Sequence, residues 1–228
     1  MTNTNNNKPG ENFNKSVQNR LLDSAEELFC EHGFEGTSIR DIAAAADCNI
    51  ASVNYYFGGK QQLYEQVWRR HLIPMRDARI ESIEKILQKE PKTTLENLIK
   101  SFATTFAGSI LDVSKTSRLG QLMAREYINR HLPPKMFVDE VMAPTITAMQ
   151  KALEQTCPNL DESKVPLVVF SLLGQLVHLV HVKTMFDEES GDASSETFDF
   201  AEAIDHIVKF SSAGIRAYIK EKNNEEKP

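Results

Sequence analysis

Apolar residues recur at the helical period of about 3.6 residues almost without interruption along this chain. From Ser16 they form an amphipathic stripe at Val17, Leu21, Leu22, Ala25, Leu28 and Phe29. Comparable stretches run from Lys60 to about Lys89 and then over residues 94–110, 115–129, 134–155, 162–186 and 200–220. We find no alternating strand pattern of useful length and no internal repeat. With two short helices between Gly33 and Lys60, the sequence predicts an all-α protein of about nine helices.

Composition narrows the class of protein. The 228 residues include 41% apolar and 25% charged residues, which is usual for a folded protein and too apolar for general disorder. No apolar run reaches the roughly 18 residues of a membrane span. Three widely spaced cysteines (Cys30, Cys48 and Cys157) argue against a disulfide framework and favour the cytoplasm. The net charge of −6 argues against coating nucleic acid by bulk charge, but it allows a small DNA-reading surface.

The stretch Gly33–Lys60 reads GFEGTSIRDIAAAADCNIASVNYYFGGK and carries the functional signal. Thr37 or Ser38 can cap a short helix, and Asn49 can cap a second one that runs through Tyr56. Two such helices joined by a tight turn form a helix-turn-helix. The second helix carries small or polar outward residues, which allow its backbone to enter a DNA major groove about 12 Å wide. A helical bundle whose turn has no binding role is the alternative.

The same stretch resembles the N-terminal DNA-binding domain of the TetR family of transcriptional regulators. The similarity spans about Asn19 to Val67 and comprises F-C-E-H-G-F, G-T-S-I-R-D-I-A-x-x-A and N-Y-Y-F-G-G-K-x-x-L-Y. It implies a homodimer whose paired recognition helices read a palindromic operator. It also implies a larger C-terminal helical domain that supplies the dimer interface and a pocket for a small-molecule inducer.

The resemblance assigns roles to matching positions of the DNA-binding domain. Arg40 is expected to read a base, and Thr37 and Ser38 to hold a phosphate. Asn49, Ala51, Ser52 and Asn54 are expected to face the groove, and Tyr55, Tyr56 and Lys60 to contact phosphates. Two positions depart from the family pattern, because Asp47 and Ala51 stand where glycine is common. Residues 1–60 hold five basic and eight acidic side chains, which predicts modest non-specific affinity.

The remainder of the chain contains no strong catalytic motif and no metal-binding motif, so we predict neither an enzyme nor a cofactor. His178 and His181 lie one turn apart, but without nearby ligands they read better as core or interface residues. Phe102, Phe106, Met123, Tyr127, Phe137, Met142 and Met149 can line an apolar ligand cavity or form ordinary core. Arg125 and Glu126 are the polar candidates beside that cavity. The segment M-A-R-E-Y-I-N-R-x-x-P-P…F…P-T-I-T-A-M also resembles the C-terminal domain of the CecR group of these regulators.

The segment S-L-L-G-Q-L-V-H-L-V-H-V is apolar almost all round, so it must be buried on more than one side. With residues 201–218 it can form a four-helix bundle with the same pair of a second subunit, or it can belong to an internal core. The predicted dimer interface consists of Leu172, Gln175, Leu176, His178, Leu179, Val182, Ile204, Ile207, Val208, Ser211 and Ile215.

The sequence therefore predicts a cytoplasmic DNA-binding regulator, a repressor, released from its operator by a small and largely apolar ligand. The expected organisation is a disordered tail (1–14), the helix-turn-helix domain (15–61), a ligand-binding and dimerisation domain (62–220) and a second tail (221–228). A helical protein-interaction module and a small-molecule enzyme with a vestigial DNA-binding domain are the alternatives.

Overall fold

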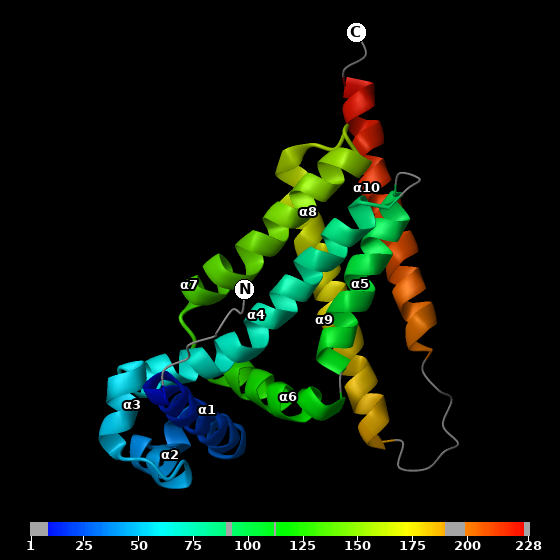
Figure 1. Cartoon of the computed structure of the whole chain (residues 1–228). Coiled ribbons are helices and arrows are strands. Elements are labelled where there is room, and N and C mark those ends of the chain that lie inside the picture. Colours follow the sequence, from blue (N-terminus) through cyan, green and yellow to red (C-terminus); the bar gives the residue numbers. More distant parts are fainter. Residues whose placement is uncertain (1–8, 90–92, 112, 190–198, 226–228) are drawn as a thin grey trace, which may run out of the picture. The chain divides into compact units, whose positions relative to one another are not determined.

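The computed structural model describes residues 9–89, 93–111, 113–189 and 199–225, and within these ranges the regular elements are all helices (Figure 1). They are α1 (Pro9–Gly36), α2 (Ile39–Ala45), α3 (Ile50–Phe57), α4 (Lys60–Leu87), α5 (Leu95–Leu111), α6 (Val113–Ile128), α7 (Pro134–Phe137), the π-helical η1 (Val138–Met142), α8 (Ala143–Thr156), the 3₁₀ turn η2 (Glu162–Lys164), α9 (Val165–Glu189) and α10 (Phe200–Glu225).

The all-α prediction is confirmed. Because α7, η1 and α8 follow one another without a break, they correspond to the single helix expected over residues 134–155. With η2 counted as the start of α9, the described residues form the nine helices that the periodicity indicates. The tail predictions need correction at their inner ends. Residues 9–14 begin α1 and residues 221–225 end α10, whereas residues 1–8 and 226–228 lie outside the described ranges.

The chain divides into two compact units, which we describe separately. Unit 1 comprises residues 1–72 and 114–134, and unit 2 comprises residues 73–113 and 135–228. The boundary therefore falls inside α4 rather than at residue 61, and α6 belongs with the helix-turn-helix. The reason is packing, because Tyr64 of α4 meets Phe29 of α1 edge-on, with ring centroids 4.9 Å apart.

The core of unit 1 is built from one face of each of its first four helices. Leu21, Ala25 and Phe29 of α1 are fully buried, as are Ile42, Ala43, Val53, Leu63 and Val67. These are the positions that the helical stripes of the sequence place inward. The short helices α2 and α3 therefore take their position from a long, firmly packed scaffold.

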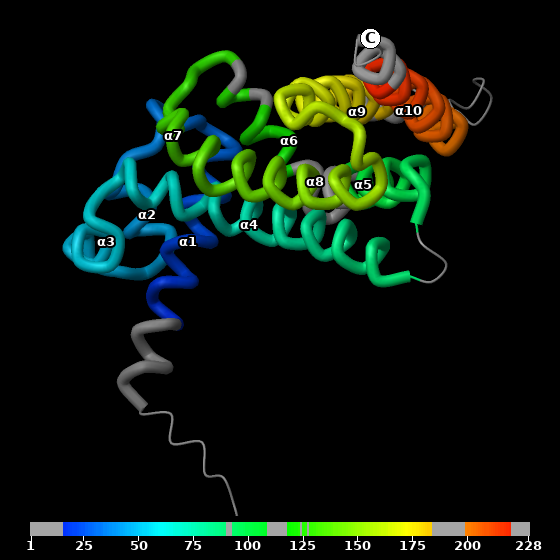
Figure 2. The backbone as a smooth tube through the Cα atoms, turned by 90° about the horizontal axis from the view of Figure 1, so that it is seen from above, coloured from blue at the N-terminus to red at the C-terminus, as the bar shows by residue number. Residues whose placement is uncertain are grey.

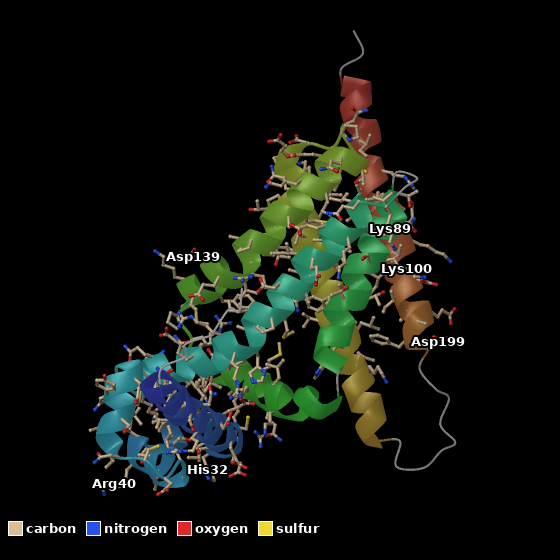
Figure 3. The ribbon with its side chains drawn as sticks, in the orientation of Figure 1. His32, Arg40, Lys89, Lys100, Asp139 and Asp199 are labelled. Carbon is tan, nitrogen blue, oxygen red and sulfur yellow. The ribbon has the colours of Figure 1, made fainter. Side chains whose placement is uncertain are left out.

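Unit 2 is a helical bundle in which α5 packs against α8, α9 and α10. In Figure 2, α5 and α8 lie between the second half of α4 and the α9–α10 pair. Two ion pairs join α5 to α10: Lys100 lies 2.8 Å from Asp205, and Glu96 lies 2.6 Å from Arg216. Lys100 is labelled in Figure 3.

One long apolar segment of unit 2 consists of η2 and most of α9. This segment, Glu162–Lys183, is long and apolar enough to cross a membrane by length and composition, with a mean hydropathy of 1.9. This differs from the expectation that no such stretch exists. One face of α9 (Val165, Val169, Leu172 and Leu176) lies in the bundle core, so burial within the single chain accounts for part of its apolar character.

Candidate nucleic-acid interface

The turn between α2 and α3 is closed by backbone hydrogen bonds. The amide of Cys48 donates to the carbonyl of Ala43 at 2.9 Å, and the amide of Asp47 donates to that of Ala44 at 3.2 Å. This pair of bonds is the Schellman motif, which requires a left-handed residue and usually takes glycine. Asp47 takes that role with φ at 49°. The Arg20 guanidinium of α1 donates to the carbonyl of Ala46 at 3.1 Å, and this bond attaches the turn to α1.

At the N-terminus of α2, the hydroxyls of Thr37 and Ser38, which with backbone N–H groups were expected to hold a phosphate, both have partners within the chain. The Thr37 side chain is 2% exposed, and its hydroxyl donates to the carbonyls of Leu28 and Gly33. The Ser38 hydroxyl donates to the Asp41 carboxylate at 2.6 Å, while the Asp41 amide donates back to that hydroxyl in a capping box. These bonds from Ser38 hold the pKa of Asp41 below its usual range. The carboxylate thus occupies the helix end where a phosphate was predicted.

Helix α3, the predicted recognition helix, has one buried and one open face. The Asn49 side chain accepts a hydrogen bond from the amide of Ala51 at 2.9 Å, so Asn49 is the predicted N-cap. Val53 is fully buried and attaches the helix to unit 1. Ala51 and Asn54 are exposed, and Ser52 is half-buried. The side chains predicted to read DNA are therefore reachable from outside.

Aromatic and basic side chains surround this open face. Tyr55 is 79% exposed and meets the ring of Tyr56 edge-on, with centroids 4.9 Å apart. The Lys60 ammonium at the start of α4 lies 4.2 Å from the ring centroid of Phe34. Arg40 is exposed on α2 and projects outward in Figure 3. The predicted DNA-contacting residues other than Thr37 thus lie on or beside the exposed side of the helix-turn-helix.

Four of the predicted ligand-contacting residues, Met123, Arg125, Glu126 and Tyr127, belong to unit 1. Arg125 has a structural role there. The Arg125 guanidinium donates to the carbonyls of Cys30 at 2.9 Å and Glu31 at 2.7 Å. Those carbonyls come just before Gly33, where a φ of 73° interrupts α1 and leaves them without helical partners. Arg125 therefore closes the end of a helix, a structural role that differs from the ligand contact expected from the sequence. Met123 is exposed, and the side chain of Tyr127 lies outside the described part.

Glu126 joins three parts of unit 1. One carboxylate oxygen accepts hydrogen bonds from the amides of His131 at 2.8 Å and Leu132 at 2.7 Å, and the other accepts from the Tyr64 hydroxyl at 2.9 Å. The His131 ring in turn stacks on Phe34, with centroids 4.5 Å apart. Burial and the bond to Glu126 raise the pKa of Tyr64. The predicted effector contact is thus a structural carboxylate, and its Tyr64 partner lies far away in the sequence.

Glu126→Ala is expected to lower the free energy of unfolding of unit 1 by about 2–3 kcal/mol, because two amides and one hydroxyl lose a charged acceptor. Chemical denaturation followed by the fluorescence of Trp68 measures this, since Trp68 is the single tryptophan and lies in unit 1. Glu126→Gln is the control, because it keeps an amide oxygen for the two backbone donors. Equal stabilities of the alanine variant and the wild type would contradict this role.

The remaining predicted ligand-contacting residues lie in unit 2. Phe102, Phe106 and Met149 are buried in the bundle core, Phe137 is 40% exposed on α7, and Met142 is half-buried. The two described pockets have other linings. One, of about 360 Å³, lies beside Cys157, Pro158 and Arg216, and the other, of about 570 Å³, lies between α9 and α10. The structure therefore places Phe102, Phe106 and Met149 in the core, and none of the five residues lines either of the two described pockets.

The predicted dimer interface is also partly corrected. Leu172, Leu176, Leu179, Ile204, Ile207, Val208 and Ile215 are buried within the single chain. Of the others, His178 is exposed, while Gln175, Val182 and Ser211 are half-buried. Gln175, His178, Leu179, Val182 and Ile207 line the larger pocket. Among the described side chains of this helix pair, the large apolar ones that are exposed are instead Leu167, Phe170, Val177, Phe210 and Tyr218.

No group of three or more His, Cys, Asp or Glu side chains that could hold a metal ion is present among the described residues. His178 and His181 therefore have no set of metal ligands around them in that part of the chain.

The chain is similar to known bacterial regulators. A family model for bacterial regulatory proteins of the tetR family matches residues 21–67, and one for the C-terminal domain of the HTH-type transcriptional dual regulator CecR matches residues 95–215. The chain is 46% identical over 52 residues to the probable HTH-type transcriptional regulator YttP of Bacillus subtilis, covering 23% of this chain and 25% of YttP. It is 38% identical over 50 residues to the biofilm operon icaADBC HTH-type negative transcriptional regulator IcaR of Staphylococcus aureus, covering 22% and 27%. The alignment thus spans about a quarter of the length of these curated relatives.

A solved structure extends the likeness to the whole fold. The transcriptional regulator FadR of Bacillus subtilis, in complex with stearoyl-CoA, superposes with a TM-score of 0.61 over 86% of this chain and 98% of that chain. At 16% identity this likeness concerns the fold alone.

Proposed function

The chain belongs to the TetR family of bacterial regulatory proteins, and from that premise we propose that it is a homodimeric transcriptional repressor that reads a palindromic operator through α3. The observation that carries this is the exposed face of α3. Ala51, Asn54 and Tyr55 point outward from a helix that is capped at its start and anchored by Val53. A helix of this kind can enter the major groove, where base edges are distinguishable. The cytoplasm, where the DNA lies, is the proposed location.

Repression is supported by the relative IcaR, which is a negative regulator and matches this chain in the DNA-binding segment. Dimerisation is supported by the apolar side chains left exposed on α9 and α10. Leu167, Phe170 and Phe210 are 57%, 49% and 64% exposed, and a second copy of the helix pair would cover them. Two copies would place two recognition helices on half-sites about 34–36 Å apart, one turn of DNA.

Release by a small, largely apolar effector completes the proposal. FadR, which shares the fold, was solved with stearoyl-CoA, and the segment matched by the CecR C-terminal model, residues 95–215, includes most of unit 2 together with α6. An effector that binds better to a dimer with another spacing of the recognition helices would weaken operator binding by that difference in affinity.

The test is fluorescence anisotropy of the purified full-length protein with DNA from upstream of its own gene. We expect binding at least about 1,000-fold tighter than to a shuffled duplex at the same salt concentration, as for specific regulators. Equal affinity for both duplexes would refute operator recognition.

Lys60→Gln is expected to weaken binding to specific and shuffled DNA alike, because it removes one phosphate contact from each subunit. A dimer of the variant neutralises two phosphates fewer than the wild type, so the slope of log affinity against log salt should become shallower by about 1.8. Salt titrations of the wild type and the variant measure this slope. Lys100→Gln is the matched control, since Lys100 is exposed on α5 and pairs with Asp205. An unchanged slope in Lys60→Gln would remove Lys60 from the DNA interface.

A further inference from the structure

An arginine stands on the buried face of α4 in unit 2. Met75, Arg79 and Ile83 are spaced four residues apart and are 9%, 7% and 1% exposed, so they share one inward face. The outer two members are apolar, as a core stripe requires. The middle one carries a guanidinium, a group that is almost never fully buried without a partner.

The partner expected for such a charge is missing from the described residues. The Nε of Arg79 is fully buried and has no acceptor in hydrogen-bonding geometry. The residues one turn away on α4 are Met75, Arg76, Ser82 and Ile83, none of which is a carboxylate. Burial alone lowers the pKa of Arg79 to about 10, with no neighbouring charge acting on it.

The other two arginines of unit 2, Arg76 and Arg216, both have partners. Arg76 donates to the Glu140 carbonyl at 2.7 Å and lies 2.6 Å from the Asp77 carboxylate, and Arg216 lies 2.6 Å from Glu96. Arg79 has instead an aromatic contact, with its guanidinium carbon 4.1 Å from the ring centroid of Phe106. Phe106 faces Phe102 with centroids 6.3 Å apart, so the surroundings on α5 are aromatic. A stacked ring offsets part of the cost of burial but accepts none of the N–H bonds.

We propose that Arg79 is the anion-binding group of the effector site of unit 2, and that the effector is an organic carboxylate with an apolar body lying against Phe106 and Phe102. This inference rests on the proposed function, since it specifies the chemistry of the effector. A carboxylate matches the planar donor fork of a guanidinium and forms paired hydrogen bonds that a neutral ligand cannot. The aromatic surroundings select a molecule whose remainder is apolar.

The buried position of Arg79 also connects effector binding to a change in the conformation of unit 2. Arg79 is 7% exposed and its Nε is fully buried, so a ligand reaches this nitrogen only when side chains around it move. A ligand that pairs with Arg79 therefore favours a rearranged unit 2 over the closed one, and this difference in affinity is what a switch requires.

Isothermal titration calorimetry of the purified full-length protein, without DNA, tests the proposal with decanoate as the probe. We expect saturable binding of decanoate, and at least tenfold weaker binding of 1-decanol, decyltrimethylammonium and acetate. The first two comparisons isolate the negative charge, and acetate isolates the apolar body. No binding of decanoate, or equal binding of either decanol or acetate, overturns the proposal.

Arg79→Met is expected to weaken decanoate binding at least tenfold while leaving the weaker binding of decanol unchanged. Methionine continues the apolar stripe, so the variant should fold, which circular dichroism checks. Arg76→Met is the matched control and should bind decanoate like the wild type, because the Arg76 guanidinium already has acceptors. Equal affinity of Arg79→Met and wild type overturns the assignment. If the protein binds decanoate through Arg79 but does not bind its upstream DNA, only the proposed repressor function is refuted. If it binds its upstream DNA but not decanoate, only this inference is refuted.

Discussion

Ala51→Glu is expected to abolish operator binding, with a loss of at least about 100-fold in affinity. Ala51 is exposed at the second position of α3, on the face proposed to enter the groove. A glutamate there places a negative charge against the phosphates and displaces the helix from base contacts that are each worth about 1–3 kcal/mol. Anisotropy with the upstream duplex at fixed salt measures the loss.

The control for this substitution is Ala201→Glu, because Ala201 is likewise exposed at the second position of a helix, α10. A glutamate in the first turn is favourable to either helix, so both variants should keep the thermal midpoint of the wild type. Ala201→Glu should also keep its DNA affinity. Operator binding by Ala51→Glu at wild-type strength would exclude α3 as the recognition helix.

Phe210→Glu is expected to dissociate the proposed dimer, raising its dissociation constant at least about 100-fold. Phe210 is 64% exposed in the single chain, so a charge there is tolerated by the monomer. In an α9–α10 bundle of two chains, each glutamate would be buried without a partner, which costs several kcal/mol. Sedimentation velocity over a range of protein concentrations measures the change. Operator affinity should fall with it, because a monomer contacts a single half-site.

Phe137→Glu is the matched control, since Phe137 is 40% exposed in unit 2 but lies on α7. It should leave the association state unchanged. If Phe210→Glu remains a dimer at the same concentrations as the wild type, the exposed face of α9 and α10 is not the dimer interface.

The local features of the DNA-binding segment could be predicted from sequence because each depends on neighbours in the chain. Ser38 and Asn49 cap their helices through residues two or three positions away, and Asp47 takes a left-handed conformation. The stripe that buries Leu21 and Phe29 follows from helical spacing. Such signals are contained in a few consecutive residues.

The roles of other residues depend on distant partners and could not be predicted in this way. Thr37 bonds to the carbonyl of Leu28, and Arg125 bonds to the backbone of α1, 94 and 95 residues away in the sequence. In the sequence, a polar pair such as Arg125 and Glu126 in a half-apolar helix has the same pattern whether its partner is a ligand or another helix. The buried position of Arg79 could have been recognised in the sequence, because its charge interrupts the apolar spacing of Met75 and Ile83.

For a related reason, seven of the eleven side chains predicted for the dimer interface are buried within the single chain. Because α9 is apolar almost all round, its sequence contains no periodic signal that separates the core face from the outer face. The choice of Leu172 and Leu176 therefore selected side chains that the single chain already buries. On α10 the pattern is amphipathic, and Phe210 interrupts its polar face, which could have identified the exposed position.

The proline inside α4 has a mechanical consequence. Pro74 lies two residues beyond the point where α4 passes from unit 1 to unit 2, and a proline has no amide hydrogen. The carbonyl of Arg70 therefore receives no bond from the helix at that place. A helix that lacks one backbone hydrogen bond bends at that place at lower cost than along its intact turns, so α4 is least stiff beside Pro74.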